Sequence, residues 1–241
     1  AHGSMYKGRR VGTIGHLGAF SLQASKHITT GDGGMTITDD DTLGERARLF
    51  ADKGWPRYSA EGARDYKMFG FNYRMTELQG AVGLAQLRKL DRICAARNWA
   101  GDLLTQLISG IPGIIPPAVT PGSVHTYWLY PLRIDEEALG MTKERFAAAV
   151  QAEGLPCAAG YIGKPIFLYE ALRNQRVYGT SHCPFDCPRR AGVRPVVYDE
   201  GVCPEAERAL NQMVTLPISE FLEESDVQDM ATIIAKVAGA D

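Results

Sequence analysis

The sequence predicts an α/β protein in two parts, residues 1–110 and residues 111–241. Segments with the alternating apolar pattern of strands are interleaved with segments that have the spacing of amphipathic helices. Between the two parts, the stretch from Ser109 to Ser123 contains four prolines and three glycines, a composition typical of a connection between compact units. The length of 241 residues, 45% of them hydrophobic, is sufficient for two hydrophobic cores.

The first part begins with short strands separated by glycine-rich turns. We expect one strand within residues 1–18, one at residues 19–22 and one at residues 35–38, with glycines 31, 33 and 34 in the turn between the last two. The run from Asp39 to Asp41 supplies capping side chains for a helix that begins near Thr42 and ends at Gly54.

The longest helix is expected from Thr76 to about Leu107. Thr76 and Gln79 have the spacing of a capping box, and a broad apolar face follows them. The segment before this helix, residues 55–67, is polar and without periodicity, which indicates an exposed loop.

The second part has the pattern of a small α+β domain. We expect its strands at residues 126–134, 155–161 and 214–218, and its helices at residues 142–152, 203–213 and 225–237. Residues 169–201 contain several prolines and are expected to be mostly loop.

Charge and composition exclude several classes of function. The formal net charge of −2 gives no indication of a nucleic-acid or anionic-membrane partner. Proline and glycine interrupt the apolar stretches, and none approaches the roughly 20 residues of a membrane span. No secretory signal is visible, so we expect a cytoplasmic protein. Because the chain does not begin with methionine, we expect the natural amino terminus to lie further upstream.

The five cysteines do not indicate a disulfide framework, because their number is odd and their spacing is wide. Cys183 and Cys187, with His182 beside them, match no common zinc spacing and have no second pair. We therefore expect no metal site, and free thiols in a reducing compartment.

Lys26 has neighbours that suit a phosphate-bearing ligand. It follows Ser21-Leu22-Gln23-Ala24-Ser25 and precedes a cluster of glycines. Small residues and bare backbone let a flat ligand approach closely, while hydroxyl and backbone N–H groups bind phosphate. A lysine buried beside such a ligand acts as a nucleophile once it has lost its proton. By residue type alone, a loop lysine is a solvated surface charge, and this alternative stays open.

Four segments, taken together and in order, resemble the signature of a known enzyme family. They are Tyr6-Lys7-Gly8-Arg9-Arg10-Val11-Gly12, Phe20-Ser21-Leu22-Gln23-Ala24-Ser25-Lys26, Gly31-Asp32-Gly33-Gly34 and Gly70-Phe71-Asn72-Tyr73-Arg74-Met75-Thr76-Glu77-Leu78-Gln79. This signature resembles that of the DegT/DnrJ/EryC1/StrS sugar aminotransferases, which depend on pyridoxal 5′-phosphate (PLP). The resemblance runs along most of the chain and is most specific in the first 90 residues.

The resemblance implies a fold and a division into domains. The fold would be that of the type I PLP transferases, which are similar to aspartate aminotransferase. Residues 1–110 would be the carboxyl-terminal part of the large PLP-binding domain, and residues 111–241 would be the small α+β domain.

The resemblance also implies roles for four residues. Lys26 would form the Schiff base with PLP, and Ser21 would hydrogen-bond the cofactor phosphate. Asn72 would reach the phosphate of the neighbouring subunit's cofactor, in a homodimer with shared active sites, and Arg74 is the second choice for that contact. Without the resemblance, Asn72 and Arg74 would be assigned to a turn at a helix entry and to a surface charge.

The chain departs from the family pattern in three respects. His16 stands where the family usually has aspartate, and Asp32 stands where it usually has glutamate; neither position carries the chemistry. In the family, an aspartate that pairs with the pyridine nitrogen lies in a segment before the position of Ala1. We therefore expect this chain to be a carboxyl-terminal fragment that is inactive alone.

The activity implied is the transfer of an amino group from glutamate or glutamine to a keto-sugar, usually nucleotide-linked, or to a keto-cyclitol. Two alternatives stay open: an inactive or non-catalytic relative, and a PLP- or pyridoxamine-phosphate-dependent sugar dehydratase. In the dehydratases, histidine replaces the Schiff-base lysine. Lys26 argues against that alternative, because the Schiff-base position holds lysine in this chain. His27 stands one residue after that position and would point elsewhere.

Overall fold

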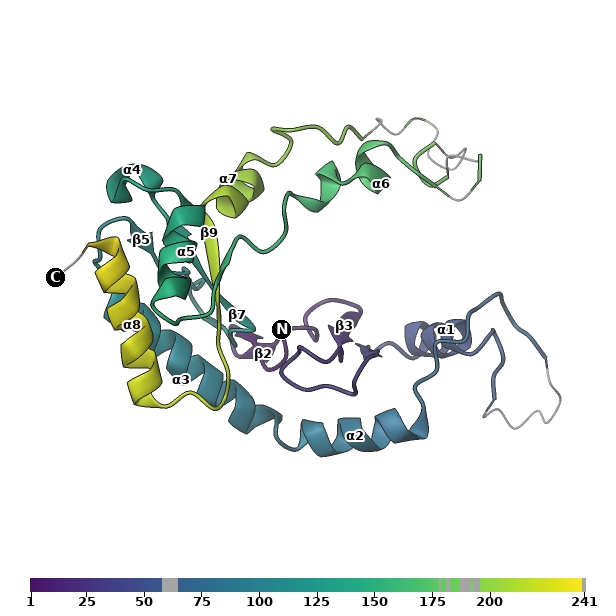
Figure 1. Cartoon of the computed structure of the whole chain (residues 1–241). Helices are drawn as coiled ribbons and strands as arrows, with labels where there is room; N and C mark the ends of the chain where they lie inside the picture. The colour runs from purple at the N-terminus through teal and green to yellow at the C-terminus, as the bar shows by residue number, and fades with distance from the viewer. Residues whose placement is uncertain (58–64, 178, 181–182, 187–191, 193–195, 240–241) are drawn as a thin grey trace. The chain divides into compact units, whose positions relative to one another are not determined.

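The computed structural model describes residues 1–57, 65–177, 179–180, 183–186, 192 and 196–239, and Figure 1 shows the order of the elements along the chain. The chain divides into two compact units. The first combines Ala1–Leu103, Ala118–Trp128 and Ile218–Glu224, and the second combines Leu104–Pro117, Leu129–Pro217 and Ser225–Asp241. The expected domains, residues 1–110 and 111–241, stay a prediction.

The first unit begins with a small antiparallel sheet. Its middle strand β1 (Met5–Tyr6) pairs with β2 (Arg9–Arg10) on one side and with β6 (Ser123–Val124) on the other. In the turn between β1 and β2, φ is 48° at Lys7 and 75° at Gly8, as in the type I′ turn whose twist matches a hairpin. The expectation of a single strand within residues 1–18 was wrong, because strands of two residues are too short to show alternation.

A second hairpin and a helix follow, close to where the sequence predicts them. Strands β3 (Gly18–Ser21) and β4 (Gly34–Ile37) are antiparallel, with Ser21 opposite Gly34. Helix α1 (Asp41–Ala51) is capped by Asp40, whose carboxylate accepts a hydrogen bond of 2.9 Å from the N–H of Leu43. The expected cap among the three aspartates is confirmed.

The expected long helix is two helices, α2 (Glu77–Leu87) and α3 (Leu90–Ile108). Thr76 and Gln79 form the expected capping box at the start of α2. The helix is interrupted at Arg88 and Lys89, neither of which is a helix-breaking residue such as proline or glycine. No side chain of α2 is buried in the described chain, and Leu78 is 82% exposed, so the predicted apolar face of this helix is open.

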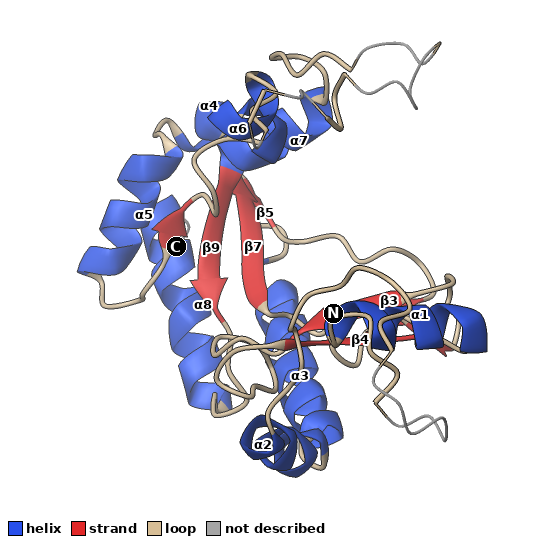
Figure 2. Ribbon diagram, turned by 90° about the vertical axis from the view of Figure 1, so that its right-hand side faces the viewer, coloured by secondary structure: helices blue, strands red, loops and turns tan. Residues whose placement is uncertain are grey.

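The second unit is built on a four-stranded antiparallel sheet, in the order β5-β7-β9-β8. Figure 2 shows β7 and β9 side by side with α5 and α8 next to them. Every second residue of β7 is buried, and Tyr130, Leu132 and Ile134 are fully buried. The strands are β5 (Ile114–Ile115), β7 (Leu129–Ile134), β8 (Ala158–Ala159) and β9 (Met213–Pro217). The helices are α4 (Glu136–Leu139), α5 (Lys143–Ala152), η1 (Ile166–Leu168), α6 (Glu170–Arg173), α7 (Pro204–Gln212) and α8 (Glu224–Ala238).

Some sequence-based expectations fall on residues that the structure does not describe. His182 and Cys187, weighed above as metal ligands, lie outside the described residues, as does part of the expected loop at residues 55–67. Within the described part of the chain, no helix combines the length and the apolar composition needed to cross a membrane.

Candidate functional site

Lys26 lies on the loop that joins β3 to β4, and this loop is closed at its base. The N–H of Leu22 donates to the carbonyl of Gly33 at 2.9 Å, and the N–H of Thr30 donates to the carbonyl of Leu22 at 2.9 Å. Leu22 and Ile28 are buried against Ile93, so the loop is anchored by an apolar side chain on each side of Lys26. The Lys26 side chain is therefore presented from a fixed loop and is itself half-buried.

Polar contacts hold the centre of this loop. The Gln23 side-chain oxygen accepts hydrogen bonds from the N–H of Ser25 at 2.8 Å and from its hydroxyl at 2.6 Å. The indole N–H of Trp128 donates to the Ser25 carbonyl at 2.7 Å, and the Lys26 Nζ lies 3.5 Å from the centroid of the Trp128 ring. Trp128 was missed in the sequence analysis, because 103 residues separate it from Ser25 and no local pattern links them.

The side chain of His27 is buried in the interior. It is 4% exposed, and its Nε2 lies 2.5 Å from the carbonyl oxygen of Thr126. Burial lowers the pKa of His27 to about 4, although the hydrogen bond to Thr126 acts in the opposite direction. This histidine is a neutral structural group under Lys26.

A second buried histidine lies close to His27. The Nε2 of His2 is 2.8 Å from the carbonyl oxygen of Ser21, and the ring centroids of His2 and His27 are 6.0 Å apart. Burial lowers the pKa of His2 as well. His2 therefore supports the backbone at Ser21, a role for which the sequence carried no signal.

Ser21 is the last residue of β3 and opens the Lys26 loop. Its side chain is exposed, and its Oγ accepts a long hydrogen bond of 3.4 Å from the N–H of Gln23. That contact does not use the hydroxyl proton, so the hydroxyl is able to donate to a ligand. Across the hairpin, Gly33 has a φ of 124°, which favours glycine at this close turn. Ser21 and Lys26 thus lie on one continuous loop.

Asn72 and Arg74 lie on an extended segment that pairs with the end of α1. The N–H of Phe71 donates to the carbonyl of Phe50 at 2.7 Å, and the N–H of Tyr73 donates to the carbonyl of Ala51 at 2.9 Å. This pairing places Asn72 opposite Asp52. The Nε of Arg74 donates to the Asn72 side-chain oxygen at 3.0 Å, so the two predicted residues are in direct contact.

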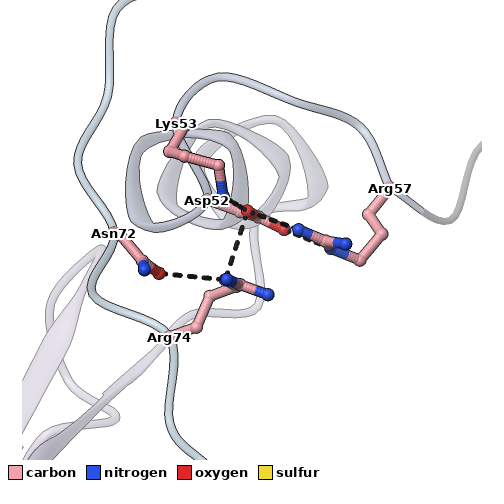
Figure 3. Close-up of polar contacts among 5 residues, drawn as sticks. All are labelled: Asp52, Lys53, Arg57, Asn72 and Arg74. Carbon is pink, nitrogen blue, oxygen red and sulfur yellow. Dashed lines mark hydrogen bonds and ion pairs between the residues drawn. The ribbon is translucent and has the colours of Figure 1, made fainter. Parts of the chain in front are cut away.

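Asp52 joins these residues to a cluster of cations, which Figure 3 shows. The side chain of Arg57 donates to both carboxylate oxygens, at 2.6 Å and 3.0 Å, and Lys53 donates at 2.5 Å. The Arg74 Nε lies 3.3 Å from Oδ1 of Asp52. The hydrogen bonds from Arg57 and Lys53 hold the pKa of Asp52 well below its usual range, so its carboxylate stays charged. Asp52 was missed in the sequence analysis, because an aspartate after a helix resembles an ordinary surface residue.

The four predicted site residues thus form two pairs, Ser21 with Lys26 and Asn72 with Arg74. Among the residues that the structure describes, no hydrogen bond or ion pair joins one pair to the other. The roles that the resemblance implies for these residues stay a prediction.

An apolar groove of about 510 Å³ lies on the first unit, next to the base of the Lys26 loop. Its wall is formed by the two hairpins and by α2. The lining residues are His2, Gly3, Arg10, Val11, Thr13, Phe20, Leu22, Ile28, Met35, Ile37, Met75, Gly80, Gly83, Leu84, Leu87 and Leu90. Because nearly all of this lining is apolar, the groove has the character of a packing surface and not of a reaction site.

Comparison with known proteins identifies similar chains. The model of the DegT/DnrJ/EryC1/StrS aminotransferase family matches residues 1–235. The chain is 29% identical over 98% of its length to the spore coat polysaccharide biosynthesis protein SpsC of Bacillus subtilis, and covers 57% of that protein. It is 34% identical over 98% of its length to an L-glutamine:2-deoxy-scyllo-inosose aminotransferase of Micromonospora echinospora, and covers 56% of it.

Solved structures share the fold. An aminotransferase from Psychrobacter cryohalolentis superimposes with a TM-score of 0.80 at 26% identity, over 98% of this chain and 59% of that one. The chain therefore spans a little more than half the length of the relatives it matches.

Proposed function

The chain belongs to the DegT/DnrJ/EryC1/StrS aminotransferase family, and we propose that the complete protein is a PLP-dependent aminotransferase. The amino group would pass from glutamate or glutamine to a keto-sugar, usually nucleotide-linked, or to a keto-cyclitol. Relatives named as an L-glutamine:2-deoxy-scyllo-inosose aminotransferase and as a GDP-perosamine synthase support this class of substrate. The observation that carries the proposal is Lys26, half-buried on an anchored loop that also bears Ser21.

The residues present fit PLP. When bound, PLP supplies a carbonyl carbon that condenses with amines and a ring that stabilises negative charge at the neighbouring carbon. Lys26 would hold the cofactor through its Nζ, and the Ser21 hydroxyl would donate a hydrogen bond to the phosphate. The exposed amide nitrogen of Asn72, whose oxygen is already bonded to Arg74, would supply a second donor. Arg74 stays the second choice for that phosphate contact.

Lys26 would also be the base of the reaction. Its Nζ would take up and release the proton of the amino donor's α-carbon. Trp128 would limit where this side chain moves, because its ring packs on the Nζ and its N–H is bonded to the preceding carbonyl.

A homodimer would bring the two pairs of residues together. Asn72 of one subunit would serve the Lys26 site of the other, which agrees with the absence of a direct contact between the pairs within the described chain. The open apolar face of α2 supports an interface at this helix.

The alternative of a sugar dehydratase is disfavoured, since His27 is turned toward Thr126 and does not take the place of Lys26.

Borohydride reduction of the PLP-loaded protein, expressed from its complete gene, tests the proposal. Reduction fixes the cofactor to its lysine as a secondary amine, and peptide mass mapping should find the pyridoxyl group on Lys26. A label on Lys53, Lys67 or no lysine would overturn the assignment, and a Lys26→Ala variant should take up no label.

A further inference from the structure

The orientation of the Asn72 amide determines what it offers to a ligand. An amide group has one acceptor end and one donor end, and a phosphate only accepts. Because Oδ1 of Asn72 accepts from the Nε of Arg74, the NH₂ group is turned the other way. Among the described residues, that nitrogen has no hydrogen-bond partner.

Arg74 does not fix this orientation by itself. Its side chain is long and 45% exposed, so in isolation it would sample several rotamers. Its Nε is held at a second point by Oδ1 of Asp52, at 3.3 Å. The guanidinium that donates to the Asn72 amide is therefore also ion-paired with Asp52, and Asp52 is the fixed partner.

Asp52 is fixed by its own surroundings. Its backbone N–H bonds to the carbonyls of Arg48 and Leu49 at the end of α1, and the residue is only 7% exposed. Arg57 binds the carboxylate with two hydrogen bonds and Lys53 with one. Such a carboxylate has little freedom to rotate, so its negative charge stays at a fixed position 3.3 Å from the Nε of Arg74.

We propose that Asp52 is a positioning residue, which acts through Arg74 to keep the Asn72 amide nitrogen turned toward the cofactor phosphate. This inference rests on the proposed function, in which Asn72 contacts that phosphate. Without Asp52, Arg74 swings into solvent and the Asn72 amide turns over freely, since its two ends have nearly the same shape. In the turned state Oδ1 faces the phosphate oxygens, and two acceptors repel each other.

The test is a titration of apo-protein, expressed from the complete gene, with PLP, followed by cofactor absorbance. Asn72→Ala should weaken PLP binding by about ten-fold, as expected for a lost hydrogen bond to a charged group. Asp52→Asn keeps the shape but loses the charge, and should weaken binding by about three- to ten-fold.

The double variant separates positioning from a general loss of structure. If Asp52 acts through Asn72, adding Asp52→Asn to Asn72→Ala should weaken PLP binding by less than about two-fold more. The matched control is Asp65→Asn, which removes the exposed ion pair between Asp65 and Lys67. Because an exposed ion pair contributes little, this variant should leave the PLP affinity unchanged.

The outcomes distinguish this inference from the proposed function. If Asn72→Ala weakens PLP binding but Asp52→Asn does not, or if the two changes are fully additive, the positioning role is wrong and the proposed function stands. If Asn72→Ala has no effect, the proposed role of Asn72 itself fails. Should Asp52→Asn not fold, Asp52→Glu provides the same test. The Asp52→Glu variant keeps the negative charge beside Lys53 and Arg57 but moves the carboxylate away from its position next to Arg74. Unchanged PLP affinity in the Asp52→Glu variant would refute the proposal.

Discussion

The ammonium nitrogen of Lys26 rests 3.5 Å from the centre of the Trp128 ring. The two residues belong to distant parts of the sequence, and the Trp128 N–H also bonds to the residue before the lysine. One side chain thus fixes both the backbone and the charged end of the proposed catalytic lysine.

Replacing Trp128 should therefore impair the reaction without unfolding the protein. Trp128→Ala removes both the ring that packs on the Nζ and the N–H that holds the Ser25 carbonyl, so the lysine is less precisely placed and kcat should fall by about ten-fold or more. Trp128→Phe keeps a ring but loses the N–H, and its kcat should lie between those of Trp128→Ala and wild type. Steady-state kinetics on the complete protein gives the answer. Trp99→Ala, at a tryptophan that is 44% exposed on α3, is the control and should retain full activity. Wild-type kcat in Trp128→Ala would show that the contact has no part in turnover.

Mixed dimers test whether active sites are shared. Lys26→Ala and Asn72→Ala should each be impaired, the first almost completely. When the two are unfolded and refolded together, about half of the dimers are mixed and each has one intact site of two, so activity should return to roughly a quarter of wild type. At a PLP concentration that leaves the Asp52→Asn sites mostly empty, Asp52→Asn should complement Lys26→Ala in the same way and should fail to complement Asn72→Ala. If the activity of the refolded mixture of Lys26→Ala and Asn72→Ala does not exceed the sum of the activities of the two separate variants, Asn72 serves the site of its own chain.

The open face of α2 should be required for assembly. Leu78 is 82% exposed in the described chain, and a charge buried at an interface is strongly unfavourable. Leu78→Glu should weaken dimerisation by about ten-fold or more in sedimentation experiments, with unchanged helical content by circular dichroism. Phe221→Glu, at a side chain that is 77% exposed and not on this helix, should leave the dimer intact. If the Leu78→Glu protein dimerises with the same affinity as wild type, the dimer interface does not include this face of α2.

The buried histidine His27 should make stability depend on pH. Its pKa is about 4 in the folded protein, against about 6.5 in an unfolded chain. Between these values only the unfolded state binds the proton, so the free energy of unfolding should fall as pH falls from 6.5 toward 4, by up to about 3 kcal/mol in total.

Urea unfolding at several pH values measures this effect. His27→Gln should reduce the slope of the unfolding free energy against pH by up to about 1.4 kcal/mol per pH unit in that window. The lowered pKa of His2 acts in the same direction, so part of the slope should persist in the His27→Gln protein. An unaltered slope would mean that His27 does not carry the effect.

Local sequence predicted those features that depend on local chemistry. The aspartate cap of α1 and the capping box of α2 follow from side chains that bond to backbone within three residues, so their patterns are visible in the sequence. Two features were missed: the two-residue strands β1 and β2, and the helix break after Leu87. Both are too short to change the pattern of apolar residues along the sequence. In the site, the resemblance to the family predicted the residues expected to contact the cofactor. Trp128 and Asp52 were not predicted, because they contact Lys26 and Arg74 across the fold and belong to no sequence motif.

The pairing of the chain's first strand with β6 has a consequence for how the protein is made. The hydroxyls of Ser4 and Thr126 are 2.9 Å apart although 122 residues separate them, and Thr126 and Trp128 are the supports of His27 and of the Lys26 loop. During synthesis, Lys26 leaves the ribosome long before its supports exist. The loop therefore assembles only after more than half of this chain has been translated, and contacts of such long range form slowly. A premature stop before residue 126 would leave the lysine present in the product but without the structure that orients it.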